Sequence, residues 1–537
     1  MRRMGPLVTV ALFAAAAALA AQSPQTASTY LTPPKVVVDI LDVPPIPAVI
    51  VSPDRRVLAI AERVSMPTMA ELSQPVVRLG GARISPKTNG LQQRTGRVHA
   101  ITLASIADGA ERKVTGPAAA SISAPVFSPD GRKLSFVNTV DDRLELWVAD
   151  VATGRAKPVT AGDQLNGTTG APCEWLGDST ALLCRLVPAS RGAAPPPPAV
   201  PTGPNVQENF GKAAPAATIQ DLLKTEHDDA LFEHYFTAQL AIVDATSGRK
   251  TLVGKAGILL ADVSPNDEFL AVTRIKRPYS RLVAWRSFPS AIEIWSRKGE
   301  VVRQLADLPS AEGVPINGVM KGPRGVQWRP DQPATVVWTE ALDEGDVKNK
   351  VPFRDKVMTL AAPFTAAPAE LAKTEWRFGG LSVTERGVVL LSEADRASRK
   401  TRTWILEAGA QPRKLWERRQ QDAYSNPGTP VVARRLGAAG AIASGVVLQN
   451  GDDIYLAGTG SSAEGDRPFL DRLNLKTLQT ERLFRSEDGT YETFVAPLDD
   501  QMKVVLTQRE TRQVAAAQAS LLPSRPSAPL RSLRYFT

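Results

Sequence analysis

Serine and histidine come first among the residues that could do chemistry, because together they could form a hydrolytic centre. A serine hydrolase of the α/β class holds its nucleophile in a Gly-x-Ser-x-Gly turn and orders its triad Ser, Asp, His. The nearest pentapeptide, Gly177-Asp178-Ser179-Thr180-Ala181, lacks the last glycine and falls in a predicted hairpin. The chain has three histidines, His99, His227 and His234. With none after His234, we expect no Ser-His-Asp triad within the chain and assign no catalytic residue.

Two of these histidines lie seven residues apart in a segment with helical spacing, so a metal site is one interpretation of His227 and His234. A polar helix packed over the rest of the fold is the other, and it is favoured because His-Glu-x-x-His is absent. The paired carboxylates Asp452-Asp453 and Asp499-Asp500 fall where turns are predicted. We therefore expect neither a metal nor another cofactor.

The chain has two cysteines, Cys173 and Cys184. A four-residue loop at 177–180 would pair Leu176 with Ala181 and place Cys173 opposite Cys184. An oxidising compartment would then permit a cross-strand disulfide. Two buried free thiols are the alternative. Metal ligation is not expected, because no histidine lies close in the sequence.

A recurring turn indicates the elements that position these residues. The copies are Val51-Ser52-Pro53-Asp54-Arg55, Phe127-Ser128-Pro129-Asp130-Gly131, Val263-Ser264-Pro265-Asn266-Asp267, Trp328-Arg329-Pro330-Asp331 and a looser Trp175-Leu176-Gly177-Asp178. Each precedes an apolar strand, and such a unit cannot bury its apolar faces alone. Several units packed in a ring make a β-propeller.

Long helical periodicity is almost absent after the N-terminus, so we expect an all-β fold. Predicted units start near residues 49, 124, 171, 258, 324, 380 and 444, and a further strand pair spans about 491–508. This spacing predicts a seven-bladed propeller, or an eight-bladed one if the last pair is a full unit.

Residues 1–21 are predicted to be a secretory signal peptide. Arg2 and Arg3 precede an apolar run from Leu7 to Leu19, and Ala18-Leu19-Ala20 fits a cleavage site. An uncleaved anchor is the alternative, but the run is short for a hydrocarbon core of about 30 Å. We expect an exported protein, periplasmic or secreted, with no membrane attachment after cleavage.

The propeller is predicted over residues 30–510. A proline-rich insertion with a short helix is expected at 188–236, and 511–537 is expected to be a connector. The 64 basic and 55 acidic residues give a net charge of +9 that is dispersed along the chain. This pattern does not favour nucleic acid as a partner, but it is compatible with weak attraction to acidic peptides.

Longer phrases resemble a known family. They are Gly203-Pro204-Asn205-Val206-Gln207-Glu208-Asn209-Phe210-Gly211-Lys212, Arg277-Pro278-Tyr279-Ser280, Trp338-Thr339-Glu340-Ala341-Leu342-Asp343, Lys400-Thr401-Arg402-Thr403-Trp404 and Gly465-Asp466-Arg467-Pro468-Phe469-Leu470-Asp471-Arg472. Over about residues 30–515 the sequence resembles the N-terminal propeller of prolyl oligopeptidase family serine peptidases, in particular the glutamyl endopeptidase branch. The segment 395–398 departs from the family pattern because it lacks aromatic residues.

In that family a propeller caps an α/β-hydrolase domain that holds the triad, and it admits short or unfolded peptides. The resemblance implies that this chain is the cap. It also implies that the α/β-hydrolase domain is absent, being missing or separately encoded, and that the chain alone is inactive. The expected partners are peptides and that hydrolase domain. The basic residues Arg274, Lys276, Arg277 and Arg281 could attract acidic peptides if they point inward, or could simply be solvated.

Two other functions remain open at this point. One is a free-standing periplasmic propeller that binds peptides or proteins. The other is a propeller enzyme of a different type, such as a lactonase or glycosidase, which needs converging carboxylates or a metal in its central channel. No spacing in the sequence requires that arrangement.

Overall fold

The computed structural model describes residues 33–92, 97–118, 120–160, 162–200, 218–433, 445–511, 518–523 and 531–533. The chain divides into two compact units, Met1–Pro44 and Pro45–Thr537. In the first unit, helix α2 (Lys35–Leu41) carries an ion pair of 2.6 Å between Lys35 and Asp39. The predicted signal peptide, residues 1–21, lies outside the described residues.

The second unit is nearly all-β, as the sequence predicts, and four-stranded antiparallel groups recur along it. Sheet 1 is β1 (Ala48–Val51), β2 (Val57–Arg63), β6 (Val98–Ser105) and β7 (Glu111–Lys113). Sheet 2 is β8 (Ile122–Phe127), β9 (Lys133–Thr139), β10 (Leu144–Asp150) and β11 (Ala156–Pro158), and one residue pair, Val98 with Ile122, joins it to sheet 1. Sheet 3 is β12 (Cys173–Trp175), β13 (Ala181–Leu186), β14 (Ala238–Asp244) and β15 (Lys250–Gly257). Sheet 4 is β16 (Leu259–Val263), β17 (Phe269–Ile275), β18 (Ser290–Ser296) and β19 (Val301–Leu308).

The same pattern continues toward the C-terminus. Sheet 5 is β20 (Arg324–Trp328), β21 (Thr335–Ala341), β22 (Asp355–Ala361) and β23 (Ala369–Thr374), and sheet 6 is β24 (Arg377–Val383), β25 (Val389–Asp395), β26 (Lys400–Leu406) and β27 (Arg413–Arg419). Sheet 7 is β28 (Thr429–Pro430), β31 (Gln449–Asn450), β32 (Asp453–Gly458), β35 (Phe469–Asn474) and β36 (Thr480–Arg485). Sheet 8 is β37 (Thr490–Pro497), β38 (Val504–Thr511), β39 (Gln518–Pro523) and β40 (Arg531–Leu533).

Smaller elements decorate these sheets. They are a three-stranded sheet of β3 (Val77–Leu79), β4 (Ala82–Ser85) and β5 (Gly90–Leu91), the pairs β29 (Val432–Ala433) with β30 (Val446–Val447) and β33 (Ser461–Ser462) with β34 (Gly465–Asp466), and the helices α3 (Met69–Leu72), α4 (Glu226–Phe236), η1 (Trp285–Ser287) and η2 (Ala311–Gly313).

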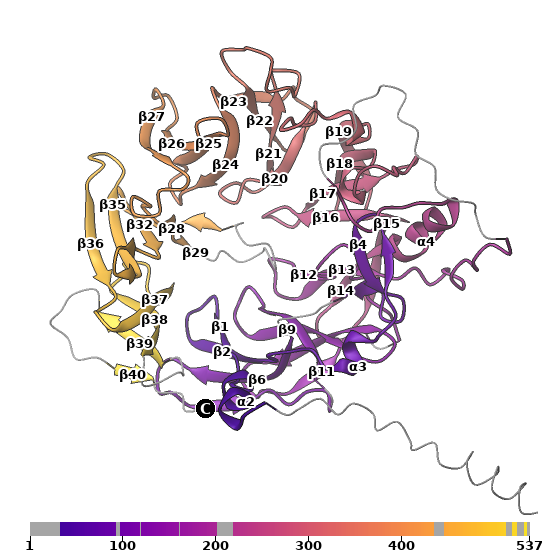
Figure 1. Cartoon of the computed structure of the whole chain (residues 1–537), viewed down its shortest axis with the longest axis horizontal. Helices are drawn as coiled ribbons and strands as arrows, with labels where there is room; N and C mark the ends of the chain where they lie inside the picture. The colour runs from indigo at the N-terminus through magenta and orange to yellow at the C-terminus, as the bar shows by residue number, and fades with distance from the viewer. Residues whose placement is uncertain are drawn as a thin grey trace, which may run out of the picture. The chain divides into compact units, whose positions relative to one another are not determined.

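The sheets of the second unit follow one another in chain order around a common centre (Figure 1). Consecutive sheets share clusters of buried apolar side chains, because each sheet is apolar on both faces and gains stability when both are covered. Sheets 1 and 2, for example, meet through Ile101, Phe127 and Leu134. The last sheet also packs on the first, since Leu506 of sheet 8 clusters with Leu58 of sheet 1.

The recurring turn has the same local geometry in its Ser-Pro-Asp copies. The Ser52 hydroxyl donates to Asp54 Oδ1 at 2.6 Å, and Ser128 repeats this bond to Asp130 at 2.6 Å. The residue after the aspartate adopts a left-handed backbone, with φ 58° at Arg55. Short polar side chains that bond locally stabilise such turns. The predicted turn is therefore confirmed at these positions.

These turns all lie at one end of the sheets. Each joins the first two strands of its sheet, and turns of neighbouring sheets touch, as where the Asp130 N–H donates to Ser179 Oγ at 3.0 Å. Because antiparallel strands alternate in direction, the next connection lies at the opposite end. We call these the turn end and the loop end. The loop end carries the described parts of the long connections, which are residues 64–92, 187–200, 218–237, 276–289 and 342–354.

The insertion predicted at 188–236 is present between β13 and β14. Its helix, α4, begins with a capping box formed by Thr225 and Asp228. Phe232 and Phe236 of this helix pack with Trp285 from the loop before β18. Residues 201–217, which include the phrase from Gly203 to Lys212, lie outside the described residues.

Two expected boundaries differ from the structure. The unit predicted to start near residue 444 begins earlier, because β28 already pairs with β32. The segment 511–537, expected to be a connector, contains β39 and β40, which continue the sheet begun by β37 and β38. The segment is rich in small residues and proline, so its sequence did not predict these strands.

Candidate functional site

Two charged side chains of sheet 3, Glu174 and Arg185, point toward sheet 4. Successive side chains of a strand alternate between its faces. Cys184 on β13 and Trp175 on β12 pack toward sheet 2, and Leu183 packs toward sheet 4. Arg185 and Glu174 therefore face sheet 4, and Arg185 lies near the loop end of its strand.

Arg185 is a partly buried cation without a matching anion. Its Nη2 donates to the carbonyl of Ala171, while its buried Nε has no hydrogen-bond partner. Within the described residues, no carboxylate lies within ion-pair distance of it. Burial lowers the pKa of Arg185 to about 10; the charge of Glu174 acts in the opposite direction, and Arg286 adds to the lowering.

Arg286 brings a second cation to the same loop. Its guanidinium lies 4.4 Å from the centre of the Trp285 ring. Its Nη2 donates to the carbonyl of Thr169 at 3.3 Å, two residues before the carbonyl that Arg185 binds. The Thr169 hydroxyl is buried without a hydrogen-bond partner. Two guanidinium groups and a free hydroxyl thus gather around residues 169–171.

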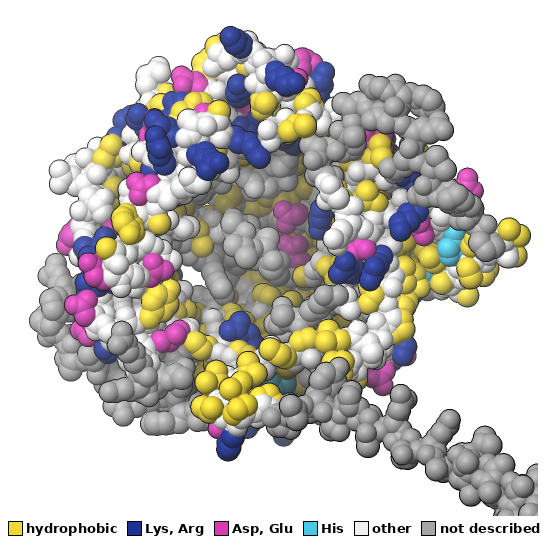
Figure 2. Space-filling model, in the orientation of Figure 1, with side chains coloured by type: hydrophobic (Ala, Val, Ile, Leu, Met, Phe, Trp, Pro, Cys, Tyr) yellow, Lys and Arg dark blue, Asp and Glu magenta, His cyan; other side chains and the backbone are white. Residues whose placement is uncertain are grey.

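Two carboxylates lie on innermost strands of neighbouring sheets, Glu174 on β12 and Asp262 on β16. Burial raises the pKa of Glu174 well above its ordinary value, and the charge of Asp262 adds to the rise. Asp262 keeps contact with solvent, yet desolvation by the surrounding protein raises its pKa to about 6. Figure 2 shows a face hollowed at its centre, with acidic side chains visible in the hollow.

The two cysteines lie directly beside these charges. Cys173 and Cys184 are register partners on β12 and β13, the arrangement expected from the length of the hairpin. They are joined by a disulfide with a Cα–Cα distance of 4.1 Å. The residues that follow them are Glu174 and Arg185. The disulfide therefore fastens the two strands that present the charged pair.

The basic residues singled out in the sequence have carboxylate partners. Arg274 pairs with Glu293 at 2.7 Å, Arg277 with Glu233 at 2.7 Å, Lys276 with Asp307 and Arg281 with Asp229. Two of these anions belong to α4, so the pairs hold that helix against sheet 4. Sequence reasoning missed Arg185, whose only signal was an arginine within the apolar strand 181–186.

The histidines on α4 do not form a recognisable metal site. His234 stacks edge-on against Tyr235, and burial followed by the charge of Arg191 lowers the pKa of His234. No group of three or more His, Cys, Asp or Glu side chains suited to a metal occurs in the part of the chain that the structure describes.

The paired carboxylates identified in the sequence have structural partners. Asp453 accepts from Asn474 Nδ2 at 2.7 Å, and Asp452 pairs with Lys476 at 3.0 Å. Asp499 accepts the Gln501 N–H at 2.8 Å, as expected for a turn.

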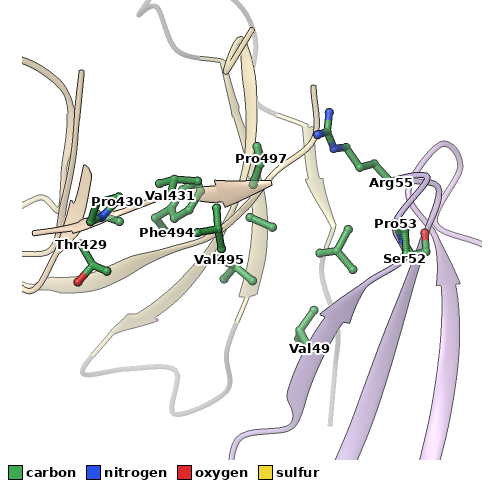
Figure 3. Close-up of a pocket in the computed structure, with 14 residues that line it drawn as sticks. Val49, Ser52, Pro53, Arg55, Thr429, Pro430, Val431, Phe494, Val495 and Pro497 are labelled. Carbon is green, nitrogen blue, oxygen red and sulfur yellow. The ribbon is translucent and has the colours of Figure 1, made fainter. Parts of the chain in front are cut away.

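A separate pocket, with a volume of about 310 Å³, is lined by residues of sheets 1, 7 and 8. Figure 3 shows Val49 on one side and Phe494, Val495 and Pro497 on the other. Its one charged lining residue, Arg55, forms an ion pair of 2.7 Å with Asp500. The pocket is mostly apolar, and it brings together no nucleophile and base.

The fold is thus nearly all-β and compatible with a propeller. The site presents charged side chains, and no Ser-His-Asp triad is assembled among the residues that the structure describes. No protein-family model matches the chain. Two curated plant proteins named "Probable glutamyl endopeptidase, chloroplastic" are similar to it. The protein from Oryza sativa subsp. japonica is 37% identical over 493 residues, which cover 88% of this chain and 52% of that protein. The protein from Arabidopsis thaliana is 35% identical over 515 residues, which cover 91% and 53%.

The chain therefore spans about half the length of the curated relatives it matches. These similarities support a relationship to a peptidase family. Among solved structures, Porphyromonas gingivalis dipeptidyl peptidase 4 covers 94% of this chain and 62% of its own, with 10% identity and a TM-score of 0.48. A structure from a study of two prolyl endopeptidases covers 82% and 54%, with 14% identity and a TM-score of 0.40. No described helix is long and apolar enough to cross a membrane.

Proposed function

We propose that this chain is the substrate-gating propeller part of an exported serine peptidase of the glutamyl endopeptidase type. The observation that carries the proposal is the extent of the match, which covers 88% and 91% of this chain but only about half of each relative. Each relative thus has an unmatched portion of about half its length, in which a hydrolase domain could lie. On this reading the chain admits peptides and leaves the cleavage to that domain.

The arrangement of the sheets supports a gating role. We infer an eight-bladed propeller, because sheet 8 has four strands and its Leu506 clusters with Leu58 of sheet 1. A ring of such sheets offers a central passage that an extended peptide could use and a folded protein could not. The long connections at the loop end supply the variable surface on which binding residues usually lie.

Export is the second part of the proposal. A signal peptide at residues 1–21 would carry the chain to an oxidising compartment, and the Cys173–Cys184 disulfide is of the kind that persists there. The named relatives are chloroplastic, so the compartment of this chain is inferred from its own first residues and its disulfide.

Activity assays on the mature chain, from residue 22 onward, purified from a bacterial periplasm, test this proposal. We expect no labelling by a fluorophosphonate and no cleavage of glutamate-containing peptides. A chimera that joins this chain to the unmatched portion of the rice relative should cleave such peptides and spare folded proteins. The rice protein itself is the control.

Labelling of the chain alone would contradict the proposal. A folded chimera that is labelled by the fluorophosphonate but fails to select peptides over folded proteins would also contradict it. Peptide binding by the chain with no activity in the chimera would instead favour a free-standing binding propeller.

A further inference from the structure

We propose that Arg185, Arg286 and Thr169 form a carboxylate-binding site at the loop end between sheets 3 and 4, which recognises acidic peptides. The identity of the ligand as a peptide rests on the proposed function. The site itself rests on the geometry of these three residues. The carboxylate could come from an acidic side chain or from a peptide C-terminus.

The first argument is the set of unused hydrogen-bond donors. The buried Nε of Arg185 and the buried hydroxyl of Thr169 have no partner in the structure. Arg286 Nη2 makes one bond of 3.3 Å, to the Thr169 carbonyl. The buried Nε of Arg377 also has no partner, so a free Nε does not by itself indicate a ligand. Buried polar groups are almost always satisfied, and at this place a free Nε and a free hydroxyl lie beside two guanidinium groups.

The second argument is charge compensation. Arg377, another partly buried arginine at the loop end, is paired with Asp343 and Asp355, whose side chains are 0% exposed. Arg185 has no such partner, and its nearest charges are Glu174 and Arg286. Burying an unpaired charge is unfavourable. The two arginines thus differ in charge pairing, because Arg377 has two carboxylate partners and Arg185 has no carboxylate within ion-pair distance among the described residues. An external anion could supply the missing charge at Arg185.

The third argument is the match to a carboxylate. A guanidinium group presents a planar fork that binds both oxygens of a carboxylate. Arg286 stacks on Trp285, which restricts its orientation before a ligand arrives. Arg185 is held by the Ala171 carbonyl, two residues along the same loop. Both forks therefore converge on one short segment, and a neutral peptide would leave their donors unpaired.

Calorimetric titration of the mature chain tests the proposal with three acetylated pentapeptides. The first has a central glutamate and an amidated end, the second replaces glutamate by glutamine, and the third is all alanine with a free carboxylate. We expect at least one carboxylate peptide to bind about 10- to 100-fold more tightly than the glutamine peptide. If the glutamate peptide binds more tightly, the site recognises an acidic side chain; if the alanine peptide does, it recognises a C-terminal carboxylate.

The double variant Arg185→Gln with Arg286→Gln should lose this preference, whereas Arg185→Lys should keep part of it. The matched control is Arg249→Gln, an exposed arginine at the turn end. Equal binding of acidic and neutral peptides by the unmodified chain would overturn the site and leave the peptide-binding function intact.

If no peptide binds, the proposed function fails, and a small probe decides the site. N-acetylglutamate amide, a side-chain carboxylate without a peptide, should raise the melting temperature of the unmodified chain but not of the double variant, because a ligand of the folded state stabilises it. Equal shifts in both proteins, or a shift in neither, would overturn the site.

Melting temperature separates a binding arginine from a structural one. Arg185→Met should leave the melting temperature unchanged or raise it, because the variant removes an uncompensated charge. Arg377→Met should lower it, because the two buried carboxylates Asp343 and Asp355 each lose one of two arginine partners. A drop for Arg185→Met as large as that for Arg377→Met would show that Arg185 is structural and would overturn the proposal.

Discussion

Single side chains tie neighbouring sheets together at the recurring turn. The indole of Trp175 donates to the carbonyl of Val126 at 3.2 Å, and that of Trp328 donates to the carbonyl of Asp262 at 3.0 Å. In each case the tryptophan precedes the turn and reaches the innermost strand of the preceding sheet. A bond of this kind contributes roughly 1 kcal/mol and also sets the spacing between the sheets.

Asp262 also provides a residue-scale prediction of pH dependence. Its pKa of about 6 lies above the ordinary value of about 4, so the folded state binds the proton more tightly than the unfolded state. The stability linked to this proton is complete below about pH 4 and is lost as the pH rises through about 6. Asp262→Asn should therefore be more stable than the unmodified chain at neutral pH and should lose that advantage in acid.

Urea unfolding across this pH range measures the effect. Asp244→Asn is the control of opposite sign, because hydrogen bonds from Ser247 lower the pKa of Asp244. That variant should lose stability at neutral pH. A difference between Asp262→Asn and the unmodified chain that does not vary with pH would contradict the assignment.

At the scale of elements, β12 is a short strand that carries part of the candidate site. It has three residues, Cys173–Trp175, and it presents Glu174. Its turn is built from local bonds, such as the Thr180 N–H to Asp178 at 2.8 Å. The disulfide adds a covalent link between this short strand and β13.

Replacement of both Cys173 and Cys184 by alanine should destabilise the mature chain by about 2–3 kcal/mol, because a short closed loop is released in the unfolded state. Urea unfolding without reductant should show the lower free energy of unfolding of the variant. Addition of reductant should lower the free energy of unfolding of the unmodified chain to that of the variant. Two reactive thiols in native protein purified from an oxidising compartment would contradict the disulfide.

At the scale of the whole second unit, stability depends on contact between its first and last sheets. Leu506 on β38 is 1% exposed and clusters with Leu58 and Ile60 of sheet 1. Arg55 and Asp500 add an ion pair at the same seam. Each sheet is thereby covered on both faces, including those at the two ends of the series.

Leu506→Ala should destabilise the unit by about 2–5 kcal/mol, as expected for a cavity in a buried core. Arg55→Ala should change stability by less than about 1 kcal/mol, because Asp500 is 82% exposed and surface ion pairs contribute little. Urea unfolding of both variants checks this contrast. If Leu506→Ala left the main transition unchanged, sheet 8 would not unfold together with sheet 1, and the proposed eight-bladed propeller would be contradicted.

The sequence by itself determined the local structure. Ser, Pro and Asp at successive positions specify the turns, alternating apolar residues specify the strands, and the loop at 177–180 sets the register that places Cys173 opposite Cys184. The insertion with its short helix was predictable for the same reason. Each of these features depends on residues that are neighbours in the chain, so a pattern of a few positions contains it.

Only the tertiary structure decided which charges are compensated. Arg277 and Arg281 pair with carboxylates on α4, whereas Arg185 and Arg286 meet at a loop where no described carboxylate pairs with them. The membership of β39 and β40 in sheet 8 was likewise decided by pairing with β38. Electrostatic pairing and strand pairing both act through space between distant segments, and a local pattern does not contain that information.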